Sequence, residues 1–154
     1  MARMNIRILA TILFAGAAAG MAAAHSGATG PVKARMDAMS SLADTLKAIA
    51  PMANGSAPID HEALDAAAGR MLESARAVPD LFSEAHTGGV SEALPLIWVD
   101  WADFTDHAGQ MVEAVEYLRE VARSGGDRDA VKTAFDGLST VCKRCHQIYW
   151  QNKR

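Results

Sequence analysis

The chain has 154 residues, of which 50% are hydrophobic, 21% are charged and 6% are aromatic, and its formal net charge at pH 7 is −3. This composition is typical of one globular domain, and it excludes a disordered or collagen-like chain. The negative charge argues against a nucleic-acid partner, which would need a basic surface.

The N-terminus has the pattern of a secretory signal peptide. Arg3 and Arg7 precede an apolar run that ends in three alanines at 22–24, and small residues of this kind mark a cleavage site. We therefore expect a signal peptide at residues 1–24 and a mature domain at 25–154 in the periplasm. An uncleaved signal anchor is the alternative, and it also places the domain outside the cytoplasm. No later stretch approaches membrane-spanning length, so we expect no membrane span in the mature chain.

Apolar residues recur every three or four positions in four stretches, which is the period of an amphipathic helix. The first stretch spans 31–53, and an Asn-Gly pair follows it as a suitable end. The second begins after Asp60, a candidate N-cap. It is expected to end near Val78, because Pro79 follows and disfavours a helical residue before it.

Residues 79–93 contain a proline and two glycines and show no sustained period, so they are interpreted as a long connection. The third helix opens at Pro95 and stops at the Ser-Gly-Gly run at 124–126. Asp127 can cap the fourth, which continues almost to the C-terminus. The third helix contains three aromatic residues, Trp98, Trp101 and Phe104. They cannot all point inward, so one of them should contact a cofactor or the long connection.

No stretch has the period of two that is typical of a half-buried strand. Four amphipathic helices joined by short, long and short connections predict an all-α fold, an antiparallel four-helix bundle. Bundles hold cofactors between facing helices, so the inner faces are where a site is expected.

The two cysteines of the chain, Cys142 and Cys145, lie directly before His146 in a Cys-x-x-Cys-His run, the attachment sequence of c-type haem. Residues three apart on a helix share a face, so each thiol can add to one vinyl group of the porphyrin. The adjacent imidazole can then bind the iron as the proximal ligand. The sequence therefore predicts one covalently bound haem c near the C-terminal end of the fourth helix.

Other uses of these three residues agree less well with the rest of the chain. A disulfide oxidoreductase would need a strand-helix-strand unit, and a structural zinc site would need a fourth ligand. A plain disulfide in an exported bundle without a cofactor would leave His146 without a role. No Ser-His-Asp set, phosphate loop or carboxylate pair stands out, so we expect the protein not to be an enzyme.

Three stretches carry a resemblance to one family. They are Val32-Lys33-Ala34-Arg35 followed by Met39, Pro95-Leu96-Ile97-Trp98 followed by Phe104, and the run from Ser139 to His146. Together they resemble the class II cytochromes c, the cytochrome c′ family, over the whole mature chain. The resemblance implies a four-helix bundle with its haem motif near the C-terminus, and a possible homodimer through the first two helices.

The resemblance implies two alternative functions, which differ in the sixth iron ligand. Met39 stands at the place that faces the distal side of the iron in this family. As an iron ligand it would imply a low-spin, single-electron carrier that serves redox partner proteins of the periplasm. If Met39 only packs on the ring, a five-coordinate cytochrome c′ that binds nitric oxide or carbon monoxide is implied. Gas-binding members commonly have a basic residue where Trp150 stands here, and this difference favours the electron carrier.

Two further residues have alternative interpretations. By resemblance Arg35 would pair with a haem propionate, because a guanidinium donates two parallel hydrogen bonds to a carboxylate. The alternative for Arg35 is an ordinary surface charge. His107 could compete for the iron, but its polar neighbours favour a polar flank of the third helix.

Overall fold

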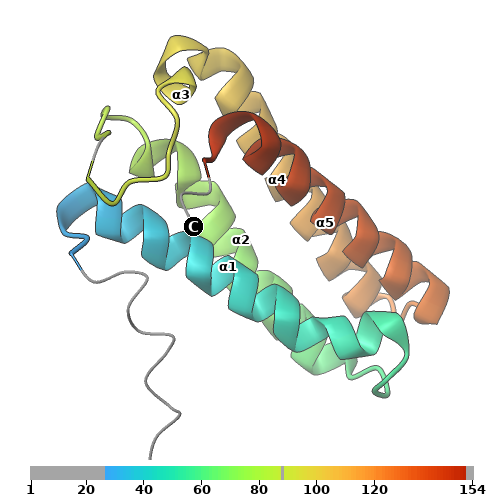
Figure 1. Ribbon diagram of the computed structural model, residues 1–154. Helices are drawn as coiled ribbons and strands as arrows, with labels where there is room; N and C mark the ends of the chain where they lie inside the picture. Colours follow the sequence, from blue (N-terminus) through green and yellow to red (C-terminus); the bar gives the residue numbers. More distant parts are fainter. Residues whose placement is uncertain (1–26, 88, 152–154) are drawn as a thin grey trace, which may run out of the picture.

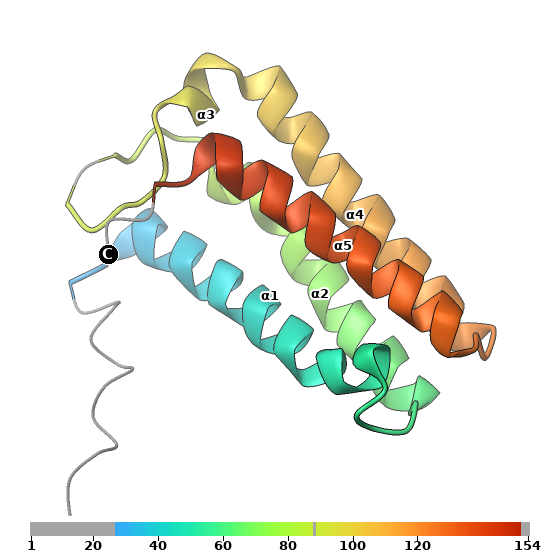
Figure 2. The same cartoon turned by 45° about the vertical axis from the view of Figure 1, so that its right-hand side comes forward.

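The computed structural model describes residues 27–87 and 89–151, so the predicted signal peptide at 1–24 lies outside the described residues. Over the described ranges the chain forms five helices: α1 Gly30–Asn54, α2 His61–Leu81, α3 Leu96–Val99, α4 Trp101–Arg123 and α5 Arg128–Tyr149. Helix α1 runs beside α2, and α4 runs beside α5, with the short α3 at one end (Figures 1 and 2). The prediction of an antiparallel four-helix bundle is confirmed.

Three of the helix boundaries predicted from local signals are confirmed. The side chain of Asp60 accepts a hydrogen bond of 2.9 Å from the Ala63 amide, and Asp127 accepts one of the same length from Ala130. Gly55 ends α1 in the left-handed conformation, with φ at 86°. Glycine adopts this conformation without the steric penalty that a Cβ would bring.

The predicted end of the second helix near Val78 is wrong, because α2 continues through Pro79 to Leu81. Pro79 has no N–H to donate and its ring crowds the carbonyl one turn earlier, but its own carbonyl and that of Val78 can still accept hydrogen bonds. The last turn of α2 is completed beyond Pro79, since the Phe82 amide donates to the carbonyls of Val78 and Pro79, each at 3.2 Å.

The third predicted helix is divided in two. Asp100, with φ −119° and ψ 60°, separates α3 from α4, and its side chain caps α4 by accepting from the Asp103 amide at 3.4 Å. Aspartate is favoured at the N-cap of a helix, because its short side chain accepts hydrogen bonds from nearby backbone amides. The helical stripe that begins at Pro95 is therefore bent at its first turn.

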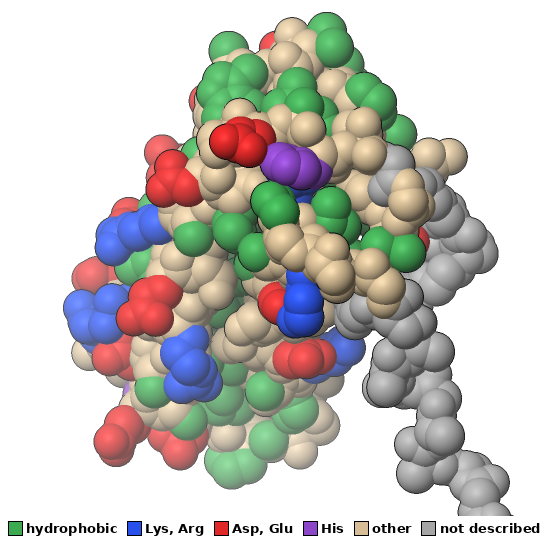
Figure 3. Space-filling view, turned by 90° about the vertical axis from the view of Figure 1, so that its left-hand side faces the viewer, with side chains coloured by type: hydrophobic (Ala, Val, Ile, Leu, Met, Phe, Trp, Pro, Cys, Tyr) green, Lys and Arg blue, Asp and Glu red, His purple; other side chains and the backbone are tan. Residues whose placement is uncertain are grey.

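The interior consists of two clusters. The large core joins α1, α2, α4 and α5 over most of their length. The aromatic core lies at the α3 end and consists of Val78, Phe82, Ile97, Phe104, Ala108 and Tyr149. Exposed hydrophobic side chains also gather at this end (Figure 3), and Val99 of α3 is 80% exposed. None of the described helices is long and apolar enough to cross a membrane.

Candidate haem site

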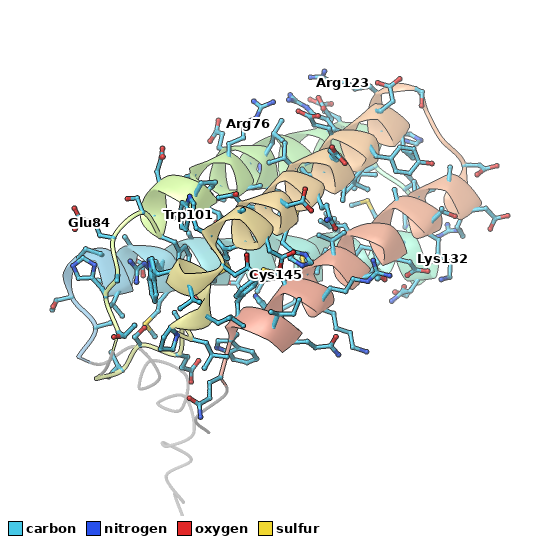
Figure 4. All side chains as sticks on the ribbon, turned by 90° about the horizontal axis from the view of Figure 1, so that it is seen from above. Arg76, Glu84, Trp101, Arg123, Lys132 and Cys145 are labelled. Atoms are coloured by element: carbon cyan, nitrogen blue, oxygen red, sulfur yellow. The ribbon has the colours of Figure 1, made fainter. Side chains whose placement is uncertain are left out.

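Helix α5 directs both cysteines toward the bundle. Cys142 packs against the large core and Cys145 against the aromatic core, so the pair spans the boundary between the two. Figure 4 shows Cys145 on the side of α5 that faces the other helices. The two thiols form no disulfide with each other. Burial raises the pKa of Cys142, and burial together with nearby Cys142 and Asp103 raises the pKa of Cys145 to about 11. Both thiols are therefore protonated at neutral pH.

His146 follows Cys142 by four residues on α5, so the two lie close to one face of the helix. Its ring is exposed and lies 5.4 Å from the Trp150 ring. The two rings line an open depression of about 520 Å³ together with Lys143 and Gln147. Partial burial lowers the pKa of His146, so its imidazole is neutral at pH 7 and has a lone pair for a metal. Two protonated thiols on one helix face and a neutral imidazole form a donor set that fits haem c.

Met39 of α1 and Met111 of α4 pack against both the large core and the aromatic core. We call this pair the core junction. Cys142 and Cys145 contact the same two cores from α5. The structure thus brings Met39 to the boundary that the cysteines span. Sequence analysis missed the matching position of Met111, because its helical stripe contains several apolar residues and nothing distinguishes this one.

Arg35 is buried, with 4% of its surface exposed, which contradicts the interpretation as an ordinary surface charge. Its guanidinium donates hydrogen bonds to the backbone carbonyls of Leu81, Glu84 and His86 at 2.7, 2.6 and 3.1 Å. These contacts use three of the five N–H donors of the group. The propionate pairing stays a prediction, and the contacts with the chain itself were not foreseen.

His107 belongs to α4, and its ring lies near Tyr149 at the end of α5. Its Nε2 is 3.6 Å from Asp103 Oδ2, and its buried Nδ1 has no hydrogen-bond partner among the described residues. Its ring is 6.0 Å from that of Tyr149. The polar flank predicted for this part of the third helix agrees with the pairing to Asp103.

The long connection is fastened at both ends by aromatic residues. Trp98 Nε1 donates to the Phe82 carbonyl at 2.7 Å, so Trp98 is the aromatic residue that contacts the connection, as predicted. Trp150 forms an isolated antiparallel bridge with Ala93, and its Nε1 donates to Glu92 Oε2 at 2.8 Å. Trp150, which occupies the position of a basic residue in the gas-binding members of the family, therefore anchors the connection to the end of α5.

A structural zinc site receives no support from the described part of the chain, which contains no group of three or more His, Cys, Asp or Glu side chains able to hold a metal ion. A haem needs no such group, because the porphyrin itself supplies four of the iron ligands.

The sequence and the structure resemble known haem proteins. Residues 30–150 match the sequence model of the family described as Cytochrome C′. The chain is 31% identical over 120 residues to a cytochrome c-556 of Agrobacterium tumefaciens (strain II Chrys), covering 78% of this chain and 96% of that one. It is 30% identical over 123 residues to a cytochrome c′ of Alcaligenes xylosoxydans xylosoxydans, covering 79% and 94%.

Solved structures of cytochrome c′ from Alcaligenes xylosoxidans have the same fold. The reduced form of one variant superposes with a TM-score of 0.73 at 27% identity, covering 79% of this chain and 94% of that one. A nitric oxide complex of another variant gives 0.73 at 28%, covering 80% and 94%. The fold and the motif thus define a helical c-type cytochrome. The chain belongs to the cytochrome c′ family, whose members carry covalently bound haem c with iron.

Proposed function

We propose that this protein binds a small neutral ligand, nitric oxide or carbon monoxide, at a haem c held by Cys142, Cys145 and His146. Haem c, when bound, would supply an iron that can exchange one electron and bind a small neutral ligand. The proposal is supported by the similarity to cytochrome c′ relatives, one of which has been solved as a nitric oxide complex.

The observation that carries the proposal is the apolar character of the core junction. The side chains that meet both cores from α1 and α4 are the methionines Met39 and Met111. An apolar surrounding disfavours charged ligands and admits neutral diatomic ones, because a buried ion needs a partner. Methionine is also flexible enough to change rotamer beside a small ligand.

Each residue of the motif has a separate task in this proposal. The S–H group of each cysteine would add across one vinyl C=C bond of the haem, so that sulfur would bond to one carbon and the hydrogen would go to the other. The two cysteines lie three residues apart on α5, and this spacing on one face suits two neighbouring vinyl groups. The neutral imidazole of His146 would donate its lone pair to the iron.

A second candidate is a low-spin electron carrier in which the Met39 thioether is the sixth ligand. One observation favours it, namely that Met39 packs against both the large core, which Cys142 contacts, and the aromatic core, which Cys145 contacts. Such a protein would pass single electrons to redox partner proteins of the periplasm. The homodimer through the first two helices stays a prediction under both candidates.

Export to the periplasm is part of the proposal. It is supported by the Arg-flanked apolar run and the alanines that end it. Intact mass measurement of the purified holoprotein tests it, and we expect a mass that corresponds to cleavage after residue 24 plus one haem. A mass that includes residues 1–24 would reject the cleavage.

Two measurements on the purified holoprotein test the haem and its ligand. After denaturation, acidified organic solvent should extract no haem, because thioether bonds survive this treatment. Absorption spectra should then show high-spin iron in both oxidation states and rapid carbon monoxide binding. Haem that leaves with the solvent would reject covalent attachment. Low-spin spectra with a weak far-red sulfur-to-iron band would instead favour the electron carrier.

A further inference from the structure

The Arg35 guanidinium lies at the C-terminal end of α2. Leu81, whose carbonyl accepts from Arg35 Nε, is the last residue of that helix, and the last turn of α2 contains no basic residue. The carbonyls at a helix C-terminus carry partial negative charge and lack intrahelical partners. Arg35 of α1 therefore supplies a positive charge that α2 does not provide for itself.

The same guanidinium holds the turn that follows. Its NH2 group donates to the Glu84 carbonyl and its NH1 group to the His86 carbonyl. These two acceptors and the Leu81 carbonyl all lie within residues 81–86, which we call the α2 turn. Three acceptors in different directions suit the planar fork of arginine, whereas lysine has one nitrogen at a single point.

Two aromatic rings enclose the charge. The Arg35 Cζ atom lies 4.7 Å from the centroid of the Phe82 ring and 5.3 Å from that of Trp98. Trp98 also donates to the Phe82 carbonyl, so α3 is fastened to the α2 turn. Arginine commonly stacks on aromatic faces in this way, and burial strengthens the attraction.

From Phe82 a series of ring contacts leads to α5. The Phe82 and Phe104 centroids are 5.2 Å apart, and those of Phe104 and Tyr149 are 5.3 Å apart in an edge-on arrangement. Tyr149 follows His146 by one helical turn. Cys145 and Met39 pack against this same aromatic core.

We propose that Arg35 is a positioning residue that fixes the α2 turn and, through Phe82, sets the packing of the aromatic core beside Cys145 and Met39. This positioning role rests on the three hydrogen bonds to the chain itself and is separate from the predicted pairing with a haem propionate. The packing of the aromatic core should affect how fast a small ligand reaches the haem, and this part rests on the proposed function. The role of Arg35 in the α2 turn does not depend on it.

Amide hydrogen exchange of the holoprotein tests this role directly, with Arg35→Lys and Arg35→Gln as the variants. Both should speed exchange of the Phe82 and Ser83 amides, which donate to carbonyls in the last turn of α2, by at least about tenfold, because neither side chain can replace the fork. Exchange in the large core at 131–138 should stay unchanged. Lys33→Gln is the matched control, since it removes an exposed charge on α1 that pairs with Asp37. It should leave both regions unchanged.

Carbon monoxide association with the ferrous holoprotein tests the effect on the site. Both Arg35 variants should bind faster than the wild type, and Lys33→Gln should bind at the wild-type rate. If Arg35→Lys keeps the wild-type exchange and rate, its charge alone suffices and the proposal is wrong. Unchanged exchange in Arg35→Gln would also contradict it.

Phe82→Leu provides an independent variant if the Arg35 variants do not fold. It removes the ring between Arg35 and Phe104 but keeps an apolar side chain, and it should also speed carbon monoxide association. An unchanged rate in this variant would contradict the proposal. A wild-type protein that binds no carbon monoxide would reject the proposed function, while the exchange result would still decide the role of Arg35 in the α2 turn.

Discussion

The Tyr149 hydroxyl donates a hydrogen bond of 2.5 Å to Asp103 Oδ2, which ties the last residue of α5 to the first turn of α4. The Tyr149 side chain is buried, with 3% of the residue exposed. The same carboxylate oxygen lies 3.6 Å from His107 Nε2. The end of α5 that follows the haem motif is therefore joined to α4 by a polar contact inside an aromatic cluster.

Tyr149→Phe should lower the free energy of unfolding by about 1–2 kcal/mol, because it removes a hydrogen bond to a charged group and keeps the ring. Urea unfolding of the holoprotein, followed by far-ultraviolet circular dichroism, measures this loss. Tyr117→Phe is the control, since Tyr117 is 51% exposed. An equal loss in both variants would mean that the contact with Asp103 contributes nothing.

Tyr149 should also give the protein an alkaline instability. Burial, with a hydrogen bond to Asp103, raises the pKa of Tyr149. The unfolded chain then releases this proton at a lower pH than the folded one, so stability falls as the pH rises above the ordinary tyrosine value of about 10. The urea midpoint of the wild type should fall more between pH 8 and 11 than that of Tyr149→Phe. Parallel curves would exclude this linkage.

Asp65→Asn should reduce the dependence of stability on acid pH. Asp65 Oδ1 accepts hydrogen bonds from Arg119 at 2.7 Å and Arg123 at 2.9 Å, which join α2 to α4. The hydrogen bond from Arg119, with that from Arg123, lowers the pKa of Asp65. Its contribution is thus present at neutral pH and is lost as the pH falls through the folded-state pKa. The urea midpoint of the wild type should fall more between pH 7 and 3 than that of the variant, and an equal fall would contradict this.

Met39→Ala should leave the ferric iron high-spin and speed carbon monoxide association, because a smaller side chain then stands at the core junction. Absorption spectra and stopped-flow mixing measure the two effects. Met36→Ala, one turn earlier on α1, is the control and should keep the wild-type rate. A native protein that is low-spin and becomes high-spin in Met39→Ala would establish the electron carrier instead.

Replacing either cysteine of the motif should largely prevent maturation of the holoprotein. In Cys142→Ala or Cys145→Ala one thioether bond cannot form, so the yield of covalently bound haem should fall strongly. Haem absorbance that stays with the protein after acidified solvent extraction measures it. Lys143→Gln, at the exposed position between them, should mature normally. Normal yields in both cysteine variants would reject the assignment.

The sequence by itself determined the features that depend on neighbouring residues. The helical periods, the caps at Asp60 and Asp127 and the glycine that ends α1 are local, because each involves atoms within about one turn of the chain. The Cys-x-x-Cys-His run is local in the same sense and was sufficient to predict the cofactor, whereas the family was predicted from this run together with the two other stretches. The four-helix arrangement followed from the number of helices and the lengths of their connections.

Tertiary structure decided where side chains meet partners that lie far away in the chain. Arg35 carries no local signal of burial, because its three acceptors lie 46 to 51 residues further on, in backbone that only the fold brings to it. Met39 and Met111 are alike in sequence to other core methionines, and only the packing of α1 and α4 on both cores distinguishes them. The break at Asp100 is partly local, because its side chain caps α4 within one turn, and partly tertiary, because Ile97 of α3 is buried in the aromatic core.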